Sequence, residues 1–266
     1  FTNYFATNAM CCPSRATYLT GQYPQNHGAL DVTTGHGYWE NTEHDDHTIA
    51  TWLAAAGYQT GFTGKYMNGY GDGTEGEGLP TYVPPGWARW FALYGGTTYD
   101  MYENTISDDG VPITTTADDY QTDLLSETAV QFLDAAPLES PAFLYLAPTA
   151  PHHEGLPAYG IQDIIRGYPA AYTFTIRPAP RHEALVVPAL PQRASFDEAD
   201  VSDKPAWLQA LAPIQPPDEA AIRDYWTDKL RALQAVDDII AATRQALAAR
   251  GRPSYLVITS DNGYFH

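Results

Sequence analysis

The side chains best suited to chemistry fall into four groups along the 266-residue chain. They are the run Cys11-Cys12-Pro13-Ser14-Arg15, Lys65, His152, and the pair Asp261-Asn262. A cysteine can supply or become a nucleophile, Arg and Lys hold anions, and imidazole transfers protons near neutral pH. Carboxylate and amide oxygens are ligands that hard cations prefer. If the fold brings these groups together, they form one candidate site.

A short helix is predicted around the first group. Pro13 suits a first helical turn and Gly21 is a typical stop, so both cysteines lie at the helix N-terminus, where the helix dipole is positive. Adjacent cysteines rarely form a disulfide with each other because the ring strains the peptide between them. The pair Cys11-Cys12 therefore says little about the redox compartment and points instead to a chemical role for a cysteine.

Lys65 follows a second predicted helix and a strand. Asp46 can cap a helix over residues 47–56, and Tyr58–Thr63 has the pattern of a strand. The apolar side chains of that helix are predicted to share one face: Ile49, Trp52 and Leu53.

The rest of the chain alternates helices with apolar strands. We predict a helix over Tyr120–Ala135, a strand buried on both faces over Ala142–Ala147, a helix over Glu219–Arg250 and a second buried strand over Tyr255–Thr259. The last helix carries an apolar stripe assigned to the core: Ile222, Trp226, Leu230, Leu233, Val236, Ile240 and Leu247. This alternation predicts an α/β fold, a mostly parallel sheet sandwiched by helices.

Ligands of such sheets bind beyond the C-terminal ends of the strands. Lys65, His152 and Asp261 each come shortly after a predicted strand, which supports one shared site. The segments Gly69–Gly86 and Gly155–Pro217 are rich in Gly, Asp or Pro and are expected to be irregular.

Composition narrows the possible functions. Hydrophobic residues make up 44% of the chain, enough for a sizeable core. The 14 Lys and Arg against 32 Asp and Glu give a net charge of −18, which disfavours binding to nucleic acid or acidic membranes. No apolar run approaches the roughly 18 residues that span a bilayer. Without an initial Met or a signal-like segment, and with a polar motif at its end, the chain is expected to be a fragment cut at both ends.

The run from Cys11 to Gly21 resembles the sulfatase family pattern C-x-P-S-R-x-x-x-L-T-G. The resemblance continues through Gly64-Lys65-Tyr66, Ala150-Pro151-His152 and Thr259 to Tyr264, in the family's order and over essentially the whole chain. Three segments look most like N-acetylglucosamine-6-sulfatases and related glycan sulfatases: Pro24 to Gly28, Gly64 to Asn68, and Pro85 to Trp87. The resemblance implies an alkaline phosphatase-like core.

The resemblance also implies that Cys11 is oxidised to formylglycine, since only Cys11 has Pro two and Arg four positions later. As a hydrate, formylglycine attacks sulfur with one hydroxyl, and loss of the second hydroxyl's proton ejects sulfate. Arg15 would steady these hydroxyls and Lys65 would hold sulfate oxygens. His152 would protonate the leaving alcohol or contact the sulfate.

A divalent cation, Ca²⁺ in the first instance, is implied with Asp261, Asn262 and the modified Cys11 as ligands. The family usually adds two acidic ligands from an N-terminal strand ending in Asp-Asp and a second lysine beyond the Asp-Asn motif, and neither lies in this chain. Residues 1–266 are therefore expected to be a partial catalytic domain that binds Ca²⁺ poorly and is inactive alone. Many sulfatases have His where this chain has Met67, and Asn68 is assigned to substrate binding in its place.

Some residues fit two interpretations. His27 and His266 each suit a substrate contact or an ordinary loop histidine, and His266 is included among the candidate substrate contacts. Trp87 and Trp90 suit core packing better than a platform for a sugar ring.

The implied activity is hydrolysis of sulfate esters on a glycosaminoglycan or mucin-type glycan, with N-acetylglucosamine 6-sulfate as a candidate. Two alternatives stay open: a phosphonate monoester or phosphodiester hydrolase on the same scaffold, and a non-catalytic glycan-binding homologue. The expected partners are a sulfated carbohydrate and a formylglycine-generating maturation enzyme, and neither nucleic acid nor a membrane. By resemblance, the protein is expected outside the cytoplasm, whether periplasmic, secreted or lysosomal.

Overall fold

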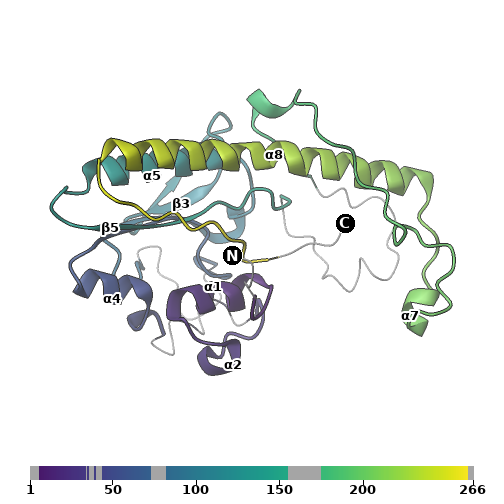
Figure 1. Ribbon diagram of the computed structural model, residues 1–266, viewed down its shortest axis with the longest axis horizontal. Coiled ribbons are helices and arrows are strands. Elements are labelled where there is room, and N and C mark those ends of the chain that lie inside the picture. The colour runs from purple at the N-terminus through teal and green to yellow at the C-terminus, as the bar shows by residue number, and fades with distance from the viewer. Residues whose placement is uncertain are drawn as a thin grey trace. The chain divides into compact units, whose positions relative to one another are not determined.

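The chain divides into two compact units in the computed structural model shown in Figure 1. The structure describes residues 6–33, 35, 39, 44–72, 82–154 and 175–262. Unit 1 comprises Phe1–Thr98, Tyr102–Thr149 and Ile239–His266, and unit 2 comprises Tyr99–Met101 and Ala150–Asp238. Of the predicted site residues that the structure describes, all lie in unit 1 except His152.

Unit 1 is built on a sheet whose strand order, within the described residues, is β4-β3-β2-β1-β5. The strands are β1 (Gln59–Gly64), β2 (Arg89–Leu93), β3 (Thr105–Asp108), β4 (Val111–Thr114) and β5 (Ala142–Ala147). β1 pairs in parallel with β2 and β5, whereas β3 pairs antiparallel with β2 and β4. The predicted α/β class is confirmed, and the sheet combines a parallel part with an antiparallel hairpin.

Helices cover both faces of this sheet. The helices are α1 (Cys11–Thr20), α2 (Pro24–His27), α4 (Ile49–Ala55) and α5 (Gln121–Ala135), with 3-10 turns at His44–Asp46 and Gly95–Thr97. Phe62 of β1 belongs to the same core cluster as α1, while a Cβ added to Gly61 would fall 2.9 Å from the Phe132 ring of α5. Successive strand residues point to opposite faces, so α1 and α5 lie on opposite sides of the sheet, as Figure 1 also shows.

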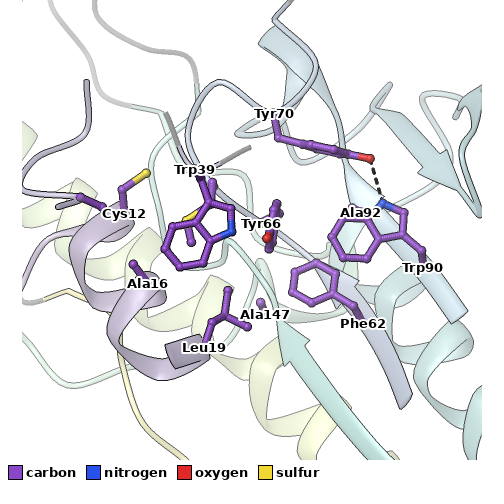
Figure 2. Packing of buried hydrophobic residues seen from close by; sticks show 12 residues of the cluster. Cys12, Ala16, Leu19, Trp39, Phe62, Tyr66, Tyr70, Trp90, Ala92 and Ala147 are labelled. Carbon is purple, nitrogen blue, oxygen red and sulfur yellow. Dashed lines mark hydrogen bonds between the residues drawn. The ribbon is translucent and has the colours of Figure 1, made fainter. Parts of the chain in front are cut away.

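The main core cluster lies between α1 and the sheet (Figure 2). Phe62 and Trp90 stack with their ring centroids 4.5 Å apart, and the Trp90 indole N–H donates to the Tyr70 hydroxyl at 2.8 Å. Trp90 is fully buried, and Trp87 packs against the same cluster. Both tryptophans therefore serve the core, as the sequence favoured.

Unit 2 is mostly irregular where the structure describes it. It holds a 3-10 turn at Pro180–His182, a short helix α7 (Ala206–Gln209) and an isolated bridge between Glu154 and Thr175. The long helix α8 (Pro216–Ala249) contributes to both units, with the division after Asp238. The prediction of irregular structure before this helix is confirmed for residues 175–215 apart from the 3-10 turn and α7, and residues 155–174 lie outside the described part.

The helix predicted over residues 47–56 starts later than expected. It spans Ile49–Ala55 with Thr48 as its N-cap residue, and the Thr48 backbone N–H donates to the Thr51 hydroxyl at 3.1 Å. Asp46 instead ends the preceding 3-10 turn. Trp52, predicted on the apolar face, is exposed, and Ala50 is the buried residue of this helix.

The buried face of α8 also differs from the predicted stripe. Leu233, which we predicted in the core, is exposed. The buried positions are Lys229, Ala232, Ala235, Ile239, Thr243 and Ala246. Alanine and threonine contribute little to a hydropathy pattern. The predicted stripe was therefore drawn through large apolar residues, whereas most of the buried positions of α8 hold alanine or threonine.

The strand predicted over Tyr255–Thr259 is wrong. These residues form no strand, and Tyr255 is 98% exposed. At either end the segment is held by side chains, since Arg252 donates to the Ser140 carbonyl at 3.0 Å and Tyr18 donates to the Ser260 carbonyl at 2.7 Å. A continuous apolar run favours a buried strand, but a strand also needs a pairing neighbour, which local sequence does not show.

β5 forms over the predicted residues but is less buried than predicted. Only Ala147 of this strand is buried, and the other five residues are partly exposed. In the described part of the sheet β5 is the last strand, so its pairing with β1 covers one edge. No helix of the described residues is both long and apolar enough to cross a membrane.

Candidate active site

Helix α1 places Cys11 in its first turn. Met10 is the N-cap residue in extended conformation, and the helix ends at Gly21, whose φ of +67° suits glycine. The Gly21 N–H donates to the Thr17 carbonyl at 2.8 Å, which closes the last turn. Both cysteines are free thiols. Cys11 thus lies at a positive helix end, where developing negative charge is stabilised.

Arg15 lies one turn after Cys11 and binds two other segments of unit 1. Its Nε donates to Asp261 Oδ2 at 2.6 Å, and its Nη1 donates to the backbone carbonyl of Lys65. Burial lowers the pKa of Arg15, but Asp261 together with the smaller contributions of Tyr145 and Cys11 outweighs it, so the net shift is upward and the guanidinium keeps its charge. Arg15 is therefore the centre of the site.

The segment that contains Asp261 and Asn262 lies along α1. Asn262 Nδ2 donates to Cys11 Sγ at 3.6 Å, and Tyr18 holds the Ser260 carbonyl. With the Arg15–Asp261 ion pair, these contacts bring the predicted pair beside Cys11.

Lys65 directly follows β1, as predicted. Its backbone N–H donates to the Ala147 carbonyl at 2.8 Å, at the C-terminal ends of β1 and β5. Gly64 has a φ of +114°, and a Cβ there would lie 2.1 Å from the Ala147 oxygen, so the chain turns here through a position that requires glycine. Lys65 is 3% exposed, and its positive charge acts on the Cys12 thiol. Lys65 and α1 thus share the site.

Cys12 faces the core and contacts Asn68. The Asn68 backbone N–H donates to Cys12 Sγ at 3.1 Å, and the thiol donates to Asn68 Oδ1 at 3.2 Å. Burial raises the pKa of Cys12 to about 11, although the Asn68 hydrogen bond opposes the shift. Cys12 therefore remains a thiol at neutral pH, which is unlike a reactive cysteine.

His152 lies in unit 2. Its ring packs on Tyr99 and His153 with centroid distances of 4.4 and 4.3 Å. Its Nδ1 is 2.8 Å from the His153 carbonyl, which can only accept, so the neutral ring carries its proton on Nδ1 and Nε2 is the basic nitrogen. Burial and the charge of Lys229 lower the pKa of His153. His152 stays a predicted member of the site.

Two further histidines, His27 and His266, were left with two interpretations by the sequence. His266 lies outside the described residues, so its substrate contact stays a prediction. His27 is fully buried, accepts the Ala29 N–H at Nδ1 and donates from Nε2 to the Thr17 hydroxyl, both at 3.2 Å. His27 is a core residue.

Sequence reasoning missed two contacts of the site, those of Cys12 and Tyr18. Both residues occupy positions where the family pattern accepts any amino acid. The helical spacing could have indicated them, because Cys12 lies three residues before Arg15 and Tyr18 three after it.

Two of the predicted metal ligands, Asp261 and Asn262, lie side by side in the described residues. Asp261 offers one carboxylate, already paired with Arg15, and Asn262 offers one amide oxygen. Within the described ranges, no group of three or more His, Cys, Asp or Glu side chains could hold a metal ion. Because Ca²⁺ takes about six to eight oxygen ligands, these residues do not form a Ca²⁺ site on their own.

Known proteins resemble this chain in sequence and in fold. The family model described as Sulfatase matches residues 1–266. Human N-acetylglucosamine-6-sulfatase is 30% identical over 275 residues, covering 99% of this chain and 45% of the relative. The extracellular sulfatase SULF-1 homolog of Drosophila melanogaster is also 30% identical, covering 99% of this chain and 22% of the relative. The chain spans less than half the length of these relatives.

One solved structure, described as a complex with its substrate D-glucosamine-2-N,6-O-disulfate, matches with a TM-score of 0.61 and 20% identity. The match covers 94% of this chain and 55% of that chain, and it shows a common alkaline phosphatase-like fold. With the Cys-x-Pro-Ser-Arg run at the start of α1 and a family match over every residue, this chain belongs to the sulfatase family.

Proposed function

We propose that the protein containing this chain hydrolyses sulfate esters on carbohydrates, and that Cys11 is the precursor of its formylglycine nucleophile. The observation that carries the proposal is the convergence of two distant segments, Asp261-Asn262 and Lys65, on α1. Asn262 contacts Cys11, and Arg15 binds both Asp261 and the backbone of Lys65. In this proposal residues 1–266 form part of the catalytic domain.

The side chains around Cys11 suit this reaction. Formylglycine supplies, as its hydrate, one hydroxyl to attack sulfur and a second whose deprotonation releases sulfate. Arg15, fixed and charged, stabilises negative charge beside Cys11, and the Lys65 ammonium binds sulfate oxygens. These cations are needed because the chain as a whole carries −18. His152 takes up a proton at Nε2 and delivers it to the leaving alcohol.

The proposed substrate is a 6-O-sulfated glucosamine unit of a glycan. Support comes from the name of the human relative and from the sulfated glucosamine bound in the solved structure. Asn68 and His266 are proposed contacts to the substrate. Asn68 Oδ1 accepts the Cys12 thiol, and the Nδ2 group is the donor end of the amide, the end that would bind a sulfate or sugar oxygen.

The proposal includes a divalent cation, Ca²⁺ in the first instance, with Asp261, Asn262 and the modified residue 11 as part of its ligand set. It also includes a maturation enzyme that converts Cys11. A location outside the cytoplasm is supported by the extracellular Drosophila relative.

The test uses the longer protein containing this chain, co-expressed with a maturation enzyme and assayed on N-acetylglucosamine 6-sulfate and on a phosphonate monoester. We expect sulfate release by the wild type and by the exposed-site control Val186→Ala, and none by Cys11→Ala. Hydrolysis of the phosphonate alone would favour the phosphonate or phosphodiester hydrolase. Glycan binding without hydrolysis of either ester would favour the non-catalytic homologue.

A further inference from the structure

The tetrapeptide Lys65–Asn68 is held to α1 at both of its ends. Arg15 binds the carbonyl of Lys65, and Cys12 exchanges two hydrogen bonds with Asn68. Cys12 and Arg15 are three residues apart on α1, so their side chains leave neighbouring positions of one face. The helix that carries Cys11 therefore fixes the segment that carries Lys65 at two points.

The thiol of Cys12 suits this contact chemically. It accepts the Asn68 backbone N–H and donates to the Asn68 amide oxygen, and a thiol or hydroxyl is the small group that can do both. The Cys12 side chain is fully buried at this contact. Alanine at this position would leave a partly buried N–H and an amide oxygen without these partners.

We infer that Cys12 is a positioning residue, whose thiol fixes the backbone and the amide orientation of Asn68 and thereby the placement of Lys65 relative to Cys11. The inference rests on the proposed function, which gives Lys65 and Cys11 their roles. The thiol accepts the Asn68 backbone N–H and donates to Asn68 Oδ1, so it holds both the backbone and the side chain of that residue.

A plain packing role for Cys12 makes a different prediction. Figure 2 shows Cys12, Ala16 and Leu19 along α1, facing the aromatic core, and all three belong to one buried cluster. If Cys12 only fills space, its replacement should act through stability, as replacement of Leu19 does. If Cys12 positions Asn68, the hydroxyl of serine should rescue what alanine loses.

The kinetic test compares Cys12→Ala, Cys12→Ser and Leu19→Ala in the longer protein, with rates divided by the formylglycine content at residue 11. Below the melting temperature of each variant, we expect Cys12→Ala to lower kcat/KM roughly tenfold. Cys12→Ser should stay within about threefold of the wild type, since serine can make both hydrogen bonds. Leu19→Ala should lower Tm yet leave kcat/KM unchanged. Equal losses in the serine and alanine variants, or no loss in either, would overturn the inference.

A second readout is independent of sulfatase activity. In the 266-residue chain, amide exchange of Asn68 is measured relative to the amides of β1. In Cys12→Ala, we expect the Asn68 amide hydrogen to exchange about tenfold faster relative to the β1 amides than in the wild type. In Cys12→Ser and Leu19→Ala, the ratio of the two exchange rates should stay at the wild-type value. An unchanged ratio in Cys12→Ala contradicts the positioning contact whatever the activity. If the exchange ratios are as predicted but the wild type hydrolyses no sulfate ester, the contact is supported and the proposed function is refuted.

Discussion

At the scale of single residues, the buried charge of Arg15 controls the geometry beside Cys11. Its guanidinium pairs with Asp261 at 2.6 Å, and the two side chains are 8% and 22% exposed. Removing one partner leaves a buried charge uncompensated. We expect Asp261→Asn to lower the free energy of unfolding by about 2 kcal/mol, measured by urea denaturation of this chain.

The control is Asp238→Asn, which removes an exposed carboxylate that contacts Arg181 and His182. Exposed pairs contribute little, so this variant should change the unfolding free energy by less than about 0.5 kcal/mol. Equal effects of the two substitutions would show that the Arg15–Asp261 pair does not organise the site.

His27 makes stability depend on pH. Burial, and then the charge of His44, lower the pKa of His27 below its usual value. Its Nδ1 already accepts the Ala29 N–H, so a proton there would face another donor. The folded state therefore binds fewer protons than the unfolded state, and stability is fully present above about pH 6.5 and lost as pH falls toward the lowered pKa.

The measurement is Tm between about pH 8 and pH 5.5, for the wild type and for His27→Gln. Glutamine cannot titrate, so the fall in Tm on acidification should be smaller in that variant. A parallel fall in both proteins would assign the acid sensitivity to other groups, such as His153, whose pKa is also lowered.

Sequence motifs named the candidate residues that the structure brings together at α1, but not the contacts that hold them there. Cys11, Arg15, Lys65 and the Asp261-Asn262 pair could be named because their chemistry and spacing are local. Helical spacing places Cys12 on the same face of α1 as Arg15, but its partner Asn68 is 56 positions away, so no local pattern identifies that partner.

At the scale of elements, the exit of β1 determines where Lys65 lies. Gly64 pairs with Ala147 in the sheet and has a positive φ, and an added Cβ would fall 2.1 Å from the Ala147 oxygen. We expect Gly64→Ala to lower Tm strongly and to reduce activity of the longer protein, because both the backbone and the β1–β5 pairing must shift.

Gly57→Ala is the matched control, since Gly57 also has a positive φ but nothing lies within 4 Å of an added Cβ. Backbone strain alone should lower the free energy of unfolding of that variant by about 1 kcal/mol. If Gly64→Ala is no worse than Gly57→Ala, the close approach of β1 and β5 at Lys65 is not rigid.

Elements with strong local signals were predicted well, and those that depend on distant partners were not. Gly21 and the helical spacing of α1 and α5 located those helices to within about two residues. The hairpin of β3 and β4 was missed, although its turn at Asp109-Gly110, both with positive φ, follows a known hairpin signal. The strand prediction for Tyr255–Thr259 was wrong because an apolar pattern does not specify a pairing partner.

At the scale of the whole molecule, the charge of −18 opposes compactness through self-repulsion. Salt screens such repulsion between exposed charges, while the buried Arg15–Asp261 pair is screened less. We expect the Tm of this chain at pH 7.5 to rise when NaCl is raised from about 10 mM to about 150 mM. A fall in Tm would mean that exposed ion pairs outweigh the acidic surplus.

The central claim is that Cys11 is the precursor of the nucleophile, with Cys12 as its positioning neighbour. The most direct measurement is mass spectrometry of the peptide spanning both cysteines, taken from longer protein that has been shown to release sulfate. We predict formylglycine at residue 11 and an unmodified thiol at residue 12, because only Cys11 lies in the Cys-x-Pro-Ser-Arg register. An active protein with an unmodified thiol at Cys11 would contradict the claim.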